Sequence, residues 1–178
     1  MEKNMRRIEL PQGMDAQIDG AKVTVKGNGR EVSKTFSAEG VSFSKEGNAI
    51  VLTAVHLSNR EVARMNAIVS HVENLIKGTK KDYEYKMGIV FSHFPMTVNV
   101  KESVVEINNF LGEKKSRRAK IVKGTKVMVK GKEVVVTGSN KEHVGQTAAN
   151  IEGAARVIGR DKRVFQDGIF IVSKSKHE

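Results

Sequence analysis

The residues of this chain that could support catalysis are scattered along it. No HExxH spacing, serine-centred elbow or paired-carboxylate motif accompanies the histidines, which are His56, His71, His93, His143 and His177. His93 stands between Phe91 and Phe94, and we expect it to be a packed or interface histidine rather than a ligand. The absence of cysteine excludes disulfides and thiolate metal sites. We therefore expect no enzymatic activity, no metal, no cofactor and no small-molecule substrate.

The chemistry that the chain does offer is cationic. Its 31 Lys and Arg outnumber its 20 Asp and Glu, which gives a net charge of +11. Residues 1 to 80 carry 12 basic and 9 acidic side chains, net +3, whereas residues 81 to 178 carry 19 and 11, net +8. Clustered cations neutralise phosphates and release their counterions, so the second half predicts a polyanionic partner. The alternative is that the excess charge only keeps the protein soluble.

Two groups of cations in the second half are candidate phosphate contacts. The first comprises Lys114, Lys115, Arg117 and Arg118, and the second comprises Arg156, Arg160, Lys162 and Arg163. Each group either touches phosphates or is a solvated face, and the pattern alone leaves both open. The chain has no Trp and only nine Phe and Tyr, so stacking on bases is not expected to dominate the contact.

A predicted helix between these two groups has an unusual solvent side. Gly145, Ala149 and Gly153 follow one another at helical spacing, beside Gln146 and Asn150. Interior glycines cost about 1 kcal/mol each relative to alanine, which suggests that something must approach the helix backbone closely. That neighbour is either a nucleic-acid backbone docked near the amino-terminal end of the helix or a closely packed protein surface.

The elements that must position these residues occur twice. Val41 to Thr53 aligns without a gap on Thr125 to Thr137, and Ser58 to Gly78 aligns on Ser139 to Gly159. This repetition predicts a duplication. The fold class is two tandem α+β domains, residues 1–81 and 82–178, each an antiparallel sheet packed against one helix.

Strands and helices are expected at equivalent places in the two copies. Short β-branched runs between Gly- or Asn-rich turns predict strands near residues 21–25, 32–36, 41–43 and 49–53, and near 83–94, 97–100, 104–107, 119–122, 127–129 and 134–137. Ser58 and Ser139, each followed three residues later by Glu, predict the helix starts, and Gly78 and Gly159 the ends. The core face of the second helix is expected to comprise Val144, Ala148, Ile151, Ala155 and Ile158.

The residues around the second helix resemble a known family. Thr137 to Glu152 (TGSNKEHVGQTAANIE), followed by Arg163 to Ile169 (RVFQDGI), are similar to the signature of the L-six family of large-subunit ribosomal proteins. The resemblance covers essentially the whole chain. The segment 160–168 (RDKRVFQDG) resembles the archaeal and eukaryotic branch, since bacterial members carry Pro-Glu-Pro-Tyr-Lys-Gly-Lys-Gly there.

This resemblance implies a structural protein that binds large-subunit rRNA near the sarcin-ricin region and the base of the factor-binding stalk. It implies that the start of the second helix faces rRNA through Asn140, Lys141, Val144, Gly145, Gln146, Thr147 and Asn150. The expected partners are rRNA and neighbouring ribosomal proteins, with one copy in each ribosome. No apolar run could span a membrane and no signal peptide is evident, so we expect the cytoplasm. A free-standing RNA chaperone or assembly factor is the alternative, and an RNA-modifying enzyme would need a catalytic constellation that is missing.

Overall fold

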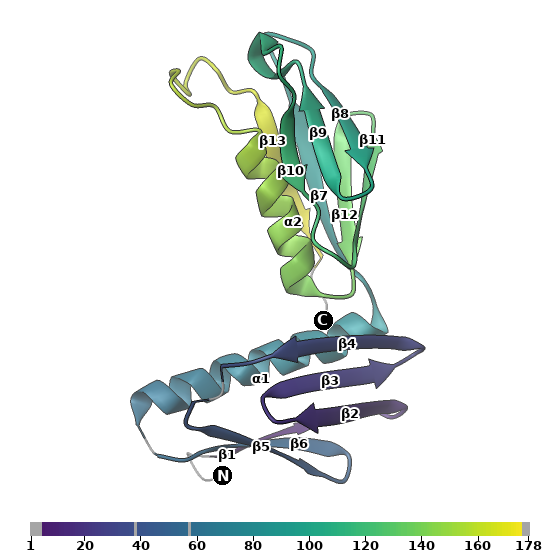
Figure 1. The fold of residues 1–178 in the computed structure, drawn as a ribbon, viewed down its shortest axis with the longest axis vertical. Helices are drawn as coiled ribbons and strands as arrows, with labels where there is room; N and C mark the ends of the chain where they lie inside the picture. The colour runs from purple at the N-terminus through teal and green to yellow at the C-terminus, as the bar shows by residue number, and fades with distance from the viewer. Residues whose placement is uncertain (1–4, 38, 57, 176–178) are drawn as a thin grey trace. The chain divides into compact units, whose positions relative to one another are not determined.

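The computed structural model describes residues 5–37, 39–56 and 58–175, which form two compact units, Met1–Lys81 and Asp82–Glu178 (Figure 1). Each unit has its own hydrophobic core. The first core is centred on Ile50, Leu52 and Met65, and the second on Met87 and Ile151, all fully buried. Each unit is therefore described separately.

The described residues of the first unit form two three-stranded antiparallel sheets and one helix (Figure 1). Its strands are β1 (Met5–Glu9), β2 (Met14–Asp19), β3 (Lys22–Gly27), β4 (Arg30–Thr35), β5 (Val41–Glu46) and β6 (Ala49–Ala54). One sheet has the order β1-β6-β5 and the other β2-β3-β4. The helix α1 (Asn59–Lys80) packs against strands of both sheets, so the three layers share one core.

The second unit repeats this plan and adds one strand. Its elements are β7 (Tyr83–Val90), β8 (Thr97–Lys101), β9 (Val104–Asn108), a short 3₁₀ turn (Phe110–Gly112), β10 (Arg117–Lys120), β11 (Thr125–Lys130), β12 (Glu133–Gly138), α2 (Lys141–Ala154) and β13 (Gly168–Lys174). The sheets have the orders β11-β12-β7-β13 and β10-β9-β8. The helix α2 packs against β10, β12 and β7.

The repetition in the sequence is also a repetition of topology. Strands β5 and β6 begin and end at the positions that align with β11 and β12, and in both units the second strand of this hairpin pairs with the first strand of the unit. This confirms two duplicated α+β domains. The strands of each copy divide between two sheets instead of forming one, because the helix buries apolar side chains from both. Strands β1, β2 and β13 were not predicted.

The helix ends differ in part from the sequence prediction. Ser58 caps α1, where its side chain accepts a hydrogen bond from the Glu61 amide (3.3 Å), as predicted. The cap of α2 is Asn140 rather than Ser139, since the Asn140 side chain accepts from the Glu142 amide (2.9 Å). The glycines end neither helix. Gly78 lies inside α1, and α2 stops at Ala154, five residues before Gly159. Ile158 therefore lies outside the helix and is 75% exposed instead of in the core.

Candidate nucleic-acid interface

The start of α2 presents fewer side chains to solvent than the family signature implies. Lys141 and Gln146 are exposed, but Val144 and Thr147 are both 0% exposed. The Thr147 hydroxyl accepts a hydrogen bond from the Val122 amide (3.1 Å) and lies 3.1 Å from the Thr125 hydroxyl. Both side chains therefore belong to the protein interior, although the family resemblance implied that they face RNA.

Two successive side-chain hydrogen bonds, called here the Gln146–Asn150 relay, connect the exposed side of α2 to β10. Gln146 Nε2 donates to the side-chain oxygen of Asn150, Oδ1 (2.9 Å), and Asn150 Nδ2 donates to the main-chain carbonyl of Lys120 (2.9 Å). These bonds fix the orientation of both side chains on the surface. Preorganised amides of this kind suit contacts with sugar and phosphate oxygens.

The small side of α2 is open only in its carboxy-terminal half. A Cβ atom added at Gly145 would lie 3.7 Å from the Tyr85 hydroxyl, which is ordinary contact with this protein's own strand β7. A Cβ added at Gly153 would meet nothing within 4 Å, and Ala149 is exposed. A side chain would therefore fit at Gly145, so packing within the protein does not require glycine there, and Ala149 and Gly153 are open to a neighbour.

The first group of cations is divided in its roles. Lys114 and Lys115 are exposed, and Arg118 is exposed beside Glu106 (3.3 Å). Arg117 instead binds both Glu113 oxygens (2.8 and 2.6 Å), and its guanidinium lies 4.2 Å from the centre of the Phe110 ring. It also donates to two main-chain carbonyls, Ala154 (3.1 Å) and Arg156 (2.7 Å). Arg117 thereby holds the end of α2, and its guanidinium donors are engaged within the protein.

The second group of cations lies on the segment that follows α2, where all four side chains are exposed. The Arg160 guanidinium lies 4.8 Å from the centre of the Phe165 ring, and Arg163 pairs with Asp161 (3.1 Å). The contacts of Arg117 with Ala154 and Arg156 join this segment to the loop that carries Lys114 and Lys115. The structure therefore brings together two groups of cations that are about 40 residues apart in the sequence.

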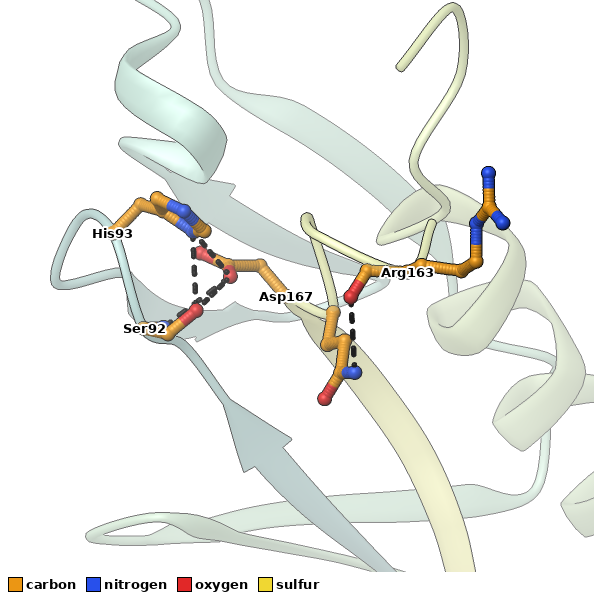
Figure 2. A network of polar contacts seen from close by, with 5 residues as sticks. Ser92, His93, Arg163 and Asp167 are labelled. Carbon is orange, nitrogen blue, oxygen red and sulfur yellow. Dashed lines mark hydrogen bonds and ion pairs between the residues drawn. The ribbon is translucent and has the colours of Figure 1, made fainter. Parts of the chain in front are cut away.

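A buried carboxylate anchors the far end of this segment (Figure 2). One oxygen of Asp167 accepts from the Ser92 amide (3.2 Å) and hydroxyl (2.9 Å) and lies 3.2 Å from His93 Nδ1. The His93 ring stacks on Phe165 with 4.6 Å between centroids, while its side chain is 34% exposed. Both the serine hydroxyl and the carboxylate approach the same nitrogen, so the three residues cannot relay a proton as a catalytic triad does.

The environment of Asp167 acts on its pKa in opposite directions. Burial raises the pKa, but hydrogen bonds from His93 and Ser92 outweigh it, and the pKa is lowered from its ordinary value of 3.8. Sequence analysis missed this site, because the partners lie more than 70 residues apart and only the fold joins them.

The lowered pKa predicts an acid-sensitive contribution to stability. Deprotonated Asp167 stabilises the folded second unit fully above pH 3.8, and this stabilisation is lost as the pH falls through the lowered pKa. We expect Asp167→Asn to reduce the dependence of the free energy of unfolding on pH below about 4. Denaturant titrations followed by tyrosine fluorescence would measure it, because the only tyrosines, Tyr83 and Tyr85, lie in this unit. Identical pH profiles for variant and parent would contradict the assignment.

A pocket of about 780 Å³ lies between α2 and the segment that follows it. Its lining includes Ala149, Gly153, Arg156, Lys162, Asp167 and Phe170. Among residues 5–37, 39–56 and 58–175, no group of three His, Cys, Asp or Glu could hold a metal ion. Within the same described ranges, no helix combines the length and apolar character needed to cross a membrane.

Comparison with known proteins gives consistent matches. The sequence profile described as Ribosomal protein L6 matches residues 10–82 and 94–168, once in each unit. Large ribosomal subunit protein uL6 of Methanobrevibacter smithii is 48% identical over 167 residues, 94% of each chain. The uL6 proteins of Sulfurisphaera tokodaii and Methanocella arvoryzae are 46% and 45% identical, over 94% and 97% of this chain and 90% and 98% of their own.

Proposed function

Since the chain belongs to the ribosomal protein L6 family in its archaeal form, a family of structural proteins and not of enzymes, we propose that it is a constituent of the large ribosomal subunit. Its second unit binds large-subunit rRNA. The observation that supports this proposal is that Arg117 links two groups of cations beside the carboxy-terminal half of α2.

The mechanism is recognition of folded RNA by its shape and its phosphates. Lys114, Lys115 and Arg156 offer positive charge, and the Gln146–Asn150 relay offers fixed amides. Such contacts position a protein on folded RNA without reading much sequence. The rRNA-facing surface is accordingly formed by Lys141, Gln146, Asn150 and the exposed cations, without the buried Val144 and Thr147.

The family resemblance supports a proposal for the location within the subunit. We place the second unit near the sarcin-ricin region and the base of the factor-binding stalk, beside neighbouring ribosomal proteins and as a single copy in cytoplasmic ribosomes. Co-sedimentation with large subunits through a high-salt wash tests the assignment. A free-standing chaperone or assembly factor would dissociate in that wash, and this result would overturn the proposal.

The exposed lysines provide a quantitative test of phosphate binding. We expect Lys114→Ala combined with Lys115→Ala to reduce the slope of log affinity against log salt by roughly 0.7–0.9 for each lost contact. Filter binding of the purified chain to large-subunit rRNA across a salt series would measure it. The charge-matched control, Lys22→Ala with Lys80→Ala, removes two exposed lysines from the first unit and should leave the slope unchanged. Equal slopes for parent and Lys114/Lys115 variant would show that this pair is a solvated face.

A further inference from the structure

One oxygen of the Asp167 carboxylate lacks a hydrogen-bond partner. Oδ1 receives the bonds from Ser92 and His93, whereas Oδ2 is buried and makes no hydrogen bond among the described residues. The side chain is only 1% exposed, and Asp167 lines the pocket beside α2. A buried, unpaired carboxylate oxygen costs more than an ordinary hydrogen bond gains, so this oxygen calls for a donor from outside the chain.

The other residues of the pocket indicate the kind of ligand that would carry this donor. Phe170 is 46% exposed and offers an apolar ring, and Ala149 and Gly153 leave room beside the helix. The exposed cations Arg156 and Lys162 also line the pocket. The second carboxylate of the pocket, Glu152, accepts a hydrogen bond from the Ile171 amide (3.3 Å). The pocket therefore combines an inner acceptor, apolar walls and outer positive charge.

We propose that this pocket takes one unstacked rRNA base that carries an exocyclic amino group, that is, adenine, cytosine or guanine. The amino group donates to Asp167 Oδ2, the base lies against Phe170, and its phosphates lie near Arg156 and Lys162. Splayed bases are commonly held by such a combination of ring contact and hydrogen bonds to their edges. A lysine or arginine from a protein would also satisfy the carboxylate, but it would bring a like charge next to Arg156 and Lys162. The inference rests on the proposed function and adds base recognition to it.

Two variants test the pocket in assembled large subunits. Asp167→Asn replaces the unpaired acceptor with an amide that can turn its NH₂ group toward the base. Gly153→Leu adds a side chain beside the pocket from a helix position where an added Cβ meets nothing within 4 Å, and it leaves the residues of the Asp167 network unchanged. Glu73→Leu, at an exposed position of α1, is the control for adding a leucine to a helix.

The measurement is chemical probing of the rRNA in subunits that contain each variant. Dimethyl sulfate and kethoxal report the base-pairing edges of adenine, cytosine and guanine, and carbodiimide reports uracil. We expect one nucleotide, an adenine, cytosine or guanine, to become at least about tenfold more reactive in subunits with either pocket variant. The same nucleotide should stay protected in subunits with Glu73→Leu. Thermal unfolding of each free variant identifies loss of fold separately.

The outcomes separate this inference from the proposed function. If the variants enter large subunits and no nucleotide changes reactivity, or if the nucleotide that changes is a uracil, the base pocket is refuted while the ribosomal role stands. If Asp167 is only an internal anchor, Asp167→Asn will lower the stability of the free protein, and Gly153→Leu will leave the reactivity of the rRNA unchanged. That result also refutes the base pocket. Failure of the unmodified chain to enter large subunits would instead refute the proposed function.

Discussion

Replacement of Arg117 by alanine is expected to lower the free energy of unfolding of the second unit by about 2–4 kcal/mol. The side chain is 22% exposed and makes two bonds to Glu113 and two to the carbonyls of Ala154 and Arg156. Hydrogen bonds to charged groups are the stronger kind, and the Ala154 carbonyl at the end of α2 and the Arg156 carbonyl just after it would lose this donor. Loss of the ring contact with Phe110 adds to the effect. Denaturant unfolding followed by tyrosine fluorescence would give the change.

The neighbouring arginine is a matched control for this experiment. The Arg118 side chain is 72% exposed, and its contact with Glu106 is a surface ion pair, so Arg118→Ala should cost less than about 1 kcal/mol. The two variants remove the same charge from adjacent positions. If they destabilised the unit equally, Arg117 would not hold the end of α2. If Arg117→Ala reduced the salt dependence of rRNA binding without loss of stability, Arg117 would be a phosphate contact after all.

Replacement of Thr147 by valine is expected to lower the free energy of unfolding of the second unit by about 1–3 kcal/mol. Valine keeps the shape of the side chain but removes the acceptor of the Val122 amide, which then has no partner in a partly buried position. Because Thr147 is 0% exposed, rRNA affinity measured well below the unfolding transition should not change.

Gln146→Ala, at the residue before Thr147, is expected to affect rRNA binding and not stability. Gln146 is exposed, so its loss should change stability by less than about 0.5 kcal/mol and weaken rRNA binding. Filter binding and unfolding measured on the same preparations would compare the two variants. Weaker binding by folded Thr147→Val than by Gln146→Ala would show that the family signature at Thr147 reports RNA contact.

The hydrophobic periodicity of α2 predicted which of its residues are buried better than the family resemblance did. Val144, Ala148, Ile151 and Ala155 were expected in the core, and all are buried. Thr147 is three residues after Val144, so helical geometry alone places it on the same face. Its assignment to the RNA side came from the family signature, which does not distinguish a residue that contacts RNA from one that supports such residues.

The contacts that the sequence could not reveal join distant segments. Charge identified Arg117 as basic, but its acceptors are carbonyls 37 and 39 residues away. The Asp167 network likewise spans 74 or 75 residues. The capping residue of α2 was misplaced by one position because Ser139 and Asn140 are both good caps, and the local pattern cannot decide between them. The duplicated hairpins were predictable, since turns and alternating strands are encoded locally.

The order of strands in the second unit has a consequence for synthesis on the ribosome. Its first strand, β7, is paired on one side with β13, the last strand in the part of the chain that the structure describes. Domains fold largely as units during translation, at roughly 5–20 residues per second, so the first unit can fold while the second is still being made. The basic unit cannot close its larger sheet, or form the carboxylate network that precedes β13, until the carboxy-terminal strand has been synthesised. Any rRNA binding that needs the complete second unit can therefore begin only after β13 has been synthesised.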